Sequence, residues 1–176
     1  MFNLILGNLF SFLSASCIAI SVIKRNKSDL IWWQIIDIIF CLFSNVFLAA
    51  YSALITNLIS LLRNILSYKN KLNVKLTILL TILCIIVGFL VNNRGIFGIL
   101  AIIASASYTV FMYTTKNNQQ MRYALIFNLT LWFIHDFYIQ AYPSTILEFF
   151  LVLWTGIQIL RNQKSHFKDT FYFLKK

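Results

Sequence analysis

The chain has 176 residues, of which 60 % are apolar and 11 % are charged, and its formal net charge is +10. Soluble domains typically contain about 45–50 % apolar and about 25 % charged residues, so the composition excludes an ordinary water-soluble enzyme or binding domain. The basic residues are divided among a few loops rather than gathered in one patch, which argues against nucleic acid as a partner.

Seven apolar segments follow one another along the chain. A hydrocarbon core about 30 Å thick requires roughly 20 apolar residues in a helix, and each segment reaches or approaches that length. The predicted transmembrane helices lie near 2–23, 30–50, 52–68, 75–92, 95–114, 122–140 and 143–161. The sequence therefore predicts an all-α, polytopic membrane protein with a single membrane domain.

The first three segments recur later in the chain at a constant offset. Gly7 matches Gly98, which lies 91 positions further on, and Leu62 matches Leu153. Further matches at this offset are Ser14-Ala15-Ser16 with Ser105-Ala106-Ser107, Asn26 with Asn117, Ala50-Tyr51 with Ala141-Tyr142, and Ile55 with Ile146. The pattern predicts a duplicated unit of three transmembrane helices.

This duplication divides the chain into four parts. The first three-helix repeat occupies 1–71, a linker helix 72–93, the second repeat 94–162, and a basic cytoplasmic tail 163–176. Because a single helix separates the repeats, both should stand the same way up in the membrane. We therefore expect two parallel three-helix bundles joined by a linker helix.

Small residues recur along one side of the first and fifth segments. They are Gly7, Ser11, Ser14 and Ala15 on the first, and Gly98, Ala101, Ser105 and Ala106 on the fifth. Small side chains allow helices to approach closely in a membrane. These two stripes are predicted to be packing seams, although the serines could also face a substrate.

Basic residues alternate between the two ends of the predicted helices. The connections after the second, fourth and sixth segments carry only Arg94, whereas the other connections and the C-terminal end hold Lys24, Arg25, Lys27, Lys69, Lys71, Lys75, Lys116, Arg122, Arg161, Lys164, Lys168, Lys175 and Lys176. The positive-inside rule then predicts an outside N-terminus and a cytoplasmic C-terminus. Lipid headgroups are sufficient partners for the tail.

Two charged residues fall in the inner half of the second and third segments. Asp37 and Arg63 each lie about 10 Å or less from the cytoplasmic end, at 1.5 Å per residue. Charges at membrane depth usually face a bundle interior, so we predict that they form an ion pair or line a cavity. The alternative for Arg63 is to extend its side chain to the interface.

A second polar group lies in the outer half of the helices. At the same offset Asn45 aligns with Asp136 and Asn57 with Glu148, so both copies kept polar side chains at these places. We predict a substrate-binding group between the repeats that consists of Asn45, Asn57, His135, Asp136, Glu148 and Trp154. No metal or other cofactor is expected, because the three cysteines lack the paired spacing of a metal site.

Structural explanations stay open for the same residues. Glu148 stands alone among apolar neighbours, where burial favours the uncharged acid and would allow it to exchange a proton. It could instead be held, protonated, by Asn57 or Tyr142. His135 and Asp136 point about 100° apart if they share a helix, so one of them could simply contact water at the outer surface.

The chain resembles the YgjV family of bacterial inner-membrane proteins. One stretch that carries the resemblance is TILEFFLVLWTGIQILRN at 145–162, in which Glu148, Gly156 and Arg161 match the family pattern. A second is WFIHDF, which matches a W-x-I-H-N-F pattern through Trp132 and His135 but has Asp136 in place of the amide.

A departure from the family pattern occurs on the third segment. Arg63 matches the arginine of an N-x-x-R element, and Ser60 stands where the asparagine would be. This weakens any expectation that the third helix coordinates a substrate as it would in relatives.

The resemblance also implies a layout and a function. Three helices, a linker and three more helices are similar to the arrangement in SWEET sugar transporters, PQ-loop proteins and PnuC vitamin-precursor transporters. By that likeness, a small polar solute would bind near the midplane between the repeats and cross the inner membrane as one repeat rocks against the other.

The alternative function is a non-transporting membrane protein, such as a partner subunit, receptor or scaffold, whose buried polar residues are structural. Homo-oligomers are compatible with either function. An enzyme is not expected, because the chain has no HExxH or GxSxG motif and no Ser/His/Asp set on facing helices.

Overall fold

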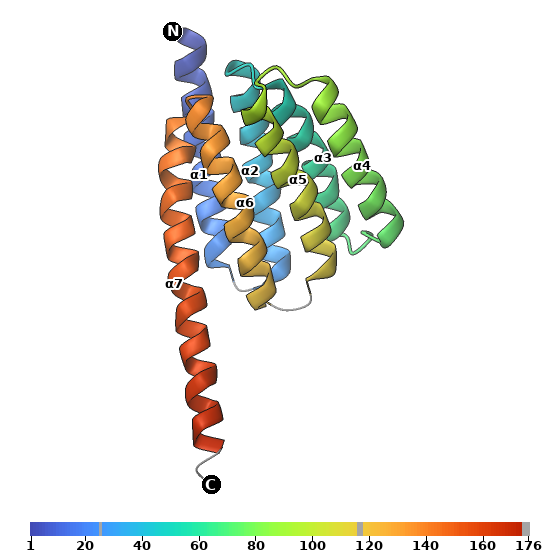
Figure 1. Cartoon of the computed structure of the whole chain (residues 1–176). Coiled ribbons are helices and arrows are strands. Elements are labelled where there is room, and N and C mark those ends of the chain that lie inside the picture. Colours follow the sequence, from blue (N-terminus) through green and yellow to red (C-terminus); the bar gives the residue numbers. More distant parts are fainter. Residues whose placement is uncertain (25, 116–117, 174–176) are drawn as a thin grey trace.

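The computed structural model describes the chain except for residues 25, 116–117 and 174–176, and it describes no side chains at 27, 118–119 and 161–173. The repeat match at Asn117 and the side chains of the predicted basic tail therefore lie outside the described residues. The secondary structure of the described residues consists of α-helices without strands (Figure 1). The all-α prediction is confirmed.

The seven helices follow the predicted segments closely. Their bounds are α1 Phe2–Ile23, α2 Lys27–Phe47, α3 Tyr51–Tyr68, α4 Val74–Leu90, α5 Ile96–Thr114, α6 Asn118–Tyr138 and α7 Tyr142–Phe173. The largest difference is in α7, whose helix continues beyond the predicted end at 161 because 162–173 contains neither glycine nor proline to stop it.

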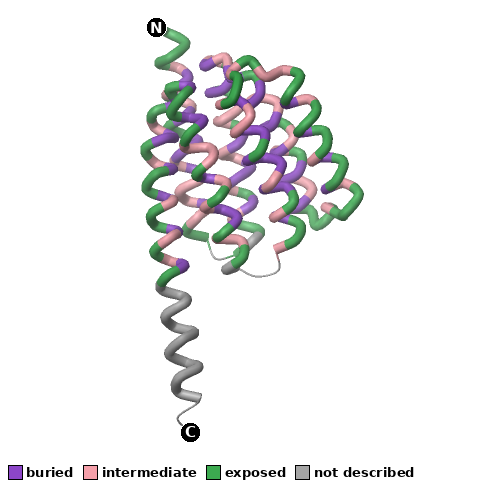
Figure 2. The backbone as a smooth tube through the Cα atoms, viewed as in Figure 1, coloured by how far each residue is buried: buried purple, intermediate pink, exposed green. Residues whose placement is uncertain are grey.

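The distribution of side chains is the reverse of that in a soluble protein. Large apolar side chains such as Leu79 and Phe150 are 53 % and 61 % exposed, whereas the polar Asn64 and His135 are fully buried. In Figure 2 the exposed segments face outward from the helices and the buried ones face the interior. An apolar exterior suits lipid, and buried polar groups mark the interior of a membrane bundle.

Among the described residues, four helices are long and apolar enough to cross a membrane: α1, Ser28–Phe47 of α2, α5, and Tyr142–Leu160 of α7. The linker α4 is apolar but shorter. Helix α3 is more polar because its buried stripe consists largely of hydroxyl, amide and guanidinium side chains; it comprises Ser52, Thr56, Asn57, Ser60, Arg63, Asn64 and Ser67 together with Ala53.

Six helices form a closed ring, and α4 lies outside it. Around the ring, α1 contacts α2, α2 contacts α3, α3 contacts α5, α5 contacts α6, α6 contacts α7, and α7 contacts α1. Helix α4 packs against α3 and α5. Among the described residues α1 does not contact α3, nor α5 contact α7, so each half is a row of three helices that the other half closes.

The contacts of one half repeat in the other. The 91-residue offset converts α1, α2 and α3 into α5, α6 and α7, and it converts the α1–α7 contact into the α5–α3 contact. Helices α1 and α5 also run in the same direction (Figure 1). A twofold axis along the helices would produce this pattern of contacts.

The turns before α3 and α7 also match in detail. Ala49 and Gln140, 91 positions apart, have positive φ angles of 51° and 66°. The backbone N–H of Ala50 donates to the Asn45 carbonyl at 3.0 Å, and that of Ala141 donates to the Asp136 carbonyl at 2.9 Å. Each turn is thus a Schellman motif in which a residue other than glycine takes the left-handed conformation.

The small-residue stripes are packing seams, as predicted. All eight residues are buried. The Ser44 hydroxyl donates to the Gly7 carbonyl at 2.9 Å, and the hydroxyls of Ser11 and Ser144 are 2.7 Å apart. These bonds join α1 to α2 and to α7, so the first seam connects both neighbours of α1 in the ring.

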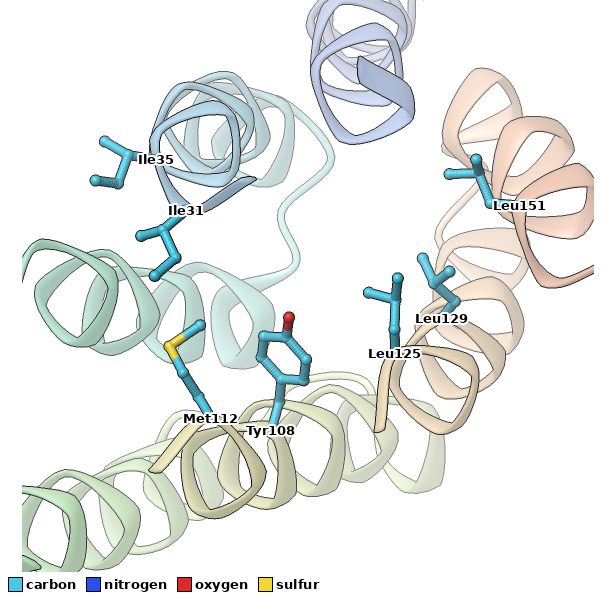
Figure 3. Packing of buried hydrophobic residues seen from close by; sticks show 7 residues of the cluster. All are labelled: Ile31, Ile35, Tyr108, Met112, Leu125, Leu129 and Leu151. Atoms are coloured by element: carbon cyan, nitrogen blue, oxygen red, sulfur yellow. The ribbon is translucent and has the colours of Figure 1, made fainter. Parts of the chain in front are cut away.

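Two apolar clusters lie toward opposite ends of the ring. The basic end is the end with the α1–α2, α3–α4 and α5–α6 connections, and the far end is the opposite one (Figure 1). The basic-end cluster consists of Ile31, Ile35, Tyr108, Met112, Leu125, Leu129 and Leu151 (Figure 3). The far-end cluster consists of Leu48, Ala50, Ala53, Ala101, Ile139 and Ala141, with Trp132 packed against it.

Candidate functional site

A cavity of about 80 Å³ lies inside the ring and is lined by residues from all six ring helices. Tyr108, Leu125 and Leu129 of the basic-end cluster are on its wall, and so is Trp132, which packs against the far-end cluster. A water molecule needs about 10–15 Å³ of such space. The cavity therefore has room for a few waters or for a solute of a few heavy atoms.

The walls of the cavity come from equivalent positions of the two halves. Both members of several pairs at the 91-residue offset line it: Ser14 and Ser105, Gln34 and Leu125, Asp37 and Asn128, Ile38 and Leu129, Cys41 and Trp132, and Asn57 and Glu148. The cavity thus lies between the halves, where the duplication places the axis. At two of these pairs an amide in one half corresponds to a carboxyl group in the other.

Three carboxyl groups line the cavity in different states of hydrogen bonding. Asp37 accepts a hydrogen bond from the Ser14 hydroxyl at 2.6 Å. Oδ1 of Asp136 lies 2.8 Å from Nδ1 of His135, within hydrogen-bond distance. Oε2 of Glu148 is buried without a hydrogen-bond partner.

Among the described side chains, neither predicted structural partner is hydrogen-bonded to Glu148. The Asn57 amide donates to the Cys41 sulfur at 3.1 Å. Tyr142 lies at the start of α7 with its side chain about half exposed, and its backbone N–H donates to Asn8 Oδ1 at 3.0 Å. Glu148 thus carries a free acceptor at the cavity wall.

Arg63 and Asp37 both line the cavity but do not form the predicted ion pair. Nε and Nη2 of Arg63 donate to Oδ1 of the adjacent Asn64 at 3.0 and 2.9 Å. Nη1 donates to the Thr109 hydroxyl at 3.1 Å and to the Ser105 carbonyl at 3.4 Å. The guanidinium also lies 5.0 Å from the centre of the Tyr108 ring, a cation–π contact.

The pair is absent because neutral acceptors on α3 and α5 satisfy the guanidinium where it lies. The alternative, extension of Arg63 to the interface, is wrong as well. The residue is only 3 % exposed.

The remaining predicted site residues lie away from the cavity wall. Asn45 and His135 are fully buried but do not line the cavity. Trp154 is 50 % exposed and faces away from the interior. The alternative prediction, that one of His135 and Asp136 contacts water at the outer surface, is wrong. Both residues are buried and bonded to each other.

Sequence reasoning missed several polar residues of the wall. Gln34 donates through Nε2 to the Tyr108 hydroxyl at 3.0 Å, and that hydroxyl points toward the interior of the ring (Figure 3). Asn64 and Asn128 also line the cavity. The sequence feature that could have identified such residues is the spacing of polar residues on α2 and α3 at steps of three and four, which places them on one helix face.

The family model described as Imp-YgjV, bacterial inner membrane protein, matches residues 5–166 of the chain. No curated protein and no solved structure matches the chain.

Proposed function

Because the chain belongs to the YgjV family of bacterial inner-membrane proteins, we propose that it carries a small polar solute across that membrane. The solute binds in the cavity between the halves. It crosses by alternating access, in which one half rocks against the other.

The observation that carries this proposal is a set of polar atoms buried without partners around the cavity. They are Oε1 of Gln34, Nδ2 of Asn64, Oγ of Ser105, Oδ1 of Asn128 and Oε2 of Glu148. Leaving one such group unsatisfied costs about 1–3 kcal/mol. A solute or waters in the cavity would satisfy these groups, whereas polar residues that only fix helix packing should be bonded to one another.

The apolar clusters suit the two gates of such a carrier. Leu48 and Ile139 are equivalent residues of the two halves, and they meet in the far-end cluster. Ile31, Met112 and Leu125 belong to three different helices and meet in the basic-end cluster. Parting either cluster would widen the path between the cavity and that side of the membrane.

The charges of the connections support one orientation for this carrier. Lys24, Lys69 and Lys71 lie at the basic end, and Arg94 lies at the far end. We propose that the basic end faces the cytoplasm, in line with the positive-inside rule. The far end would then face the outside and receive the solute in the outward-open state.

The proposal is tested with purified protein and a panel of sugars, nucleosides and vitamin precursors. Thermal unfolding in detergent identifies those that stabilise the protein, and exchange of each labelled hit is then measured in proteoliposomes. We expect at least one hit to exchange. Asn128→Ala should weaken its binding, whereas Thr130→Ala, an exposed α6 residue bonded to its own helix backbone, should not.

A scaffold or partner subunit would give a different outcome. Its unfolding temperature would be indifferent to every solute of the panel, or the hits would bind without exchanging across the bilayer. Either result would contradict the carrier.

A further inference from the structure

We infer that the solute of this cavity is a small cation that presents several N–H donors, such as a compact ammonium or amidinium group. The inference deepens the proposed function and rests on it for the statement that the bound cation is transported. Binding of the cation to the cavity can be established separately.

The first argument is the imbalance of ionisable groups on the wall. Asp37, Asp136 and Glu148 come from three different helices, and all line the same cavity. Arg63 is the only basic side chain on the wall among the residues that the structure describes. His135 lies behind the wall and is bonded to Asp136. The carboxyl groups therefore outnumber the fixed cations, and a cation bound among them would stabilise their ionised form in a low-dielectric interior.

The second argument is that Arg63 is not free to hold an anion. Four hydrogen bonds run from its guanidinium to Asn64, Thr109 and the Ser105 carbonyl. Its face lies over the Tyr108 ring. An anion that took these donors would leave the Asn64 amide oxygen unpaired in the interior. Arg63 is therefore part of the scaffold of the wall.

The third argument is the kind of atom that is left without a partner. Glu148 and Gln34 both line the cavity, are 8 % and 4 % exposed, and each has a buried oxygen, Oε2 or Oε1, without a hydrogen-bond partner. Both oxygens accept hydrogen bonds. Nδ2 of Asn64 is the one unpartnered wall atom that only donates. A ligand rich in N–H donors with a positive charge satisfies the acceptors, whereas an anion would repel Glu148.

The size of the cavity limits the cation to a few heavy atoms. Its volume of about 80 Å³ suits guanidinium, which is planar and permanently charged. Urea and acetate have the same number of heavy atoms and a similar planar shape. They are neutral and negatively charged, respectively, so the three probes separate charge from size.

The experiment measures binding of labelled guanidinium, urea and acetate to the detergent-purified protein by equilibrium dialysis. It also measures their uptake into proteoliposomes. We expect saturable binding of guanidinium and none of acetate, with urea at least about tenfold weaker. Glu148→Gln and Asp37→Asn should each weaken guanidinium binding by about tenfold or more. Asp29→Asn, which removes an exposed carboxylate at the start of α2, should change it less than about twofold.

Equal binding of the three probes, preference for acetate, or no binding of any probe would overturn the inference. So would guanidinium binding that survives both cavity substitutions. Uptake distinguishes failure of the cation preference from failure of the carrier. Guanidinium that binds as predicted but never enters the vesicles would leave the cation site standing and contradict transport. Uptake of urea in preference to guanidinium would leave the carrier standing and contradict the preference for a cation.

Discussion

Arg63 shows how a buried charge can be stabilised without a carboxylate. Its donors reach an amide, a hydroxyl and a carbonyl, and its face meets an aromatic ring. Only a planar guanidinium can make all of these contacts at once. The residue joins α3 to α5, which belong to different halves, and it therefore helps to close the ring.

This arrangement predicts independent effects of Asp37→Asn and Arg63→Met on the free energy of unfolding. Because the two side chains form no ion pair, their combined loss should equal the sum of the single losses within about 0.5 kcal/mol. The measurement is a double-mutant cycle on unfolding in mixed micelles. A double variant that is clearly more stable than the sum predicts would indicate a direct pair and contradict the structure.

Depth in the membrane could be predicted for the polar residues, but their partners could not. Counting along each helix correctly indicated that Asp37, Arg63 and Glu148 were interior residues. The count does not fix how far each helix is rotated about its axis. Once Glu148 faces the cavity, Trp154 is directed outward, because it lies six positions further along α7 and about 120° away around the helix at about 100° per residue.

Helix α3 illustrates why hydropathy alone underestimates a helix of a membrane bundle. Its interior stripe is polar, while Leu58 and Leu62 on the other side are exposed. Averaging the hydropathy over the whole helix combines the polar face with the apolar face, so the mean value is low. The helix was nevertheless predicted, because its apolar segment approaches the length needed to cross a membrane.

Close helix packing predicts opposite effects for two glycine substitutions. In Gly7→Ala the new Cβ would lie 2.7 Å from two side-chain atoms of Leu48, so we expect a loss of about 1–3 kcal/mol. In Gly156→Ala the Cβ has no atom within 4 Å, so we expect no loss and a gain of up to about 1 kcal/mol from helix propensity. Thermal unfolding in detergent measures both, and equal effects would contradict the predicted seam.

The two Schellman turns predict a stabilising change. Ala49 and Gln140 adopt a left-handed conformation that costs a residue other than glycine roughly 1–2 kcal/mol. Ala49→Gly and Gln140→Gly should therefore each raise the free energy of unfolding by about 1 kcal/mol. Ala50→Gly is the control: Ala50 has a φ of −96° and is fully buried, so this change should destabilise. A loss of stability at both turns would argue against the matched geometry.

The duplication explains the shape of the whole molecule as well as its cavity. Equivalent helices make equivalent contacts, and the two turns with positive φ recur at the same offset. The apolar segments were sufficient to predict where the helices of the described residues lie. The open row within each half was not predicted, because matched residues reveal which helices correspond but not which of them touch.

The orientation is tested with a cysteine-free protein that carries one new cysteine at a time. Lys71→Cys at the basic end should react with a membrane-impermeant thiol reagent only in inverted membrane vesicles. Gln140→Cys at the far end should react only in intact cells. The opposite pattern would place the basic end outside. The outward-open state would then open at the basic end, contrary to the proposal.

The native Cys41 provides the most direct test of alternating access, because it lines the cavity between the two gates. The measurement uses a Cys17→Ala/Cys84→Ala protein and a small, permanently charged methanethiosulfonate reagent, applied to intact cells and to inverted membrane vesicles. A carrier whose gates open in turn predicts that Cys41 is modified from both sides. Modification from one side alone, or from neither, would contradict it.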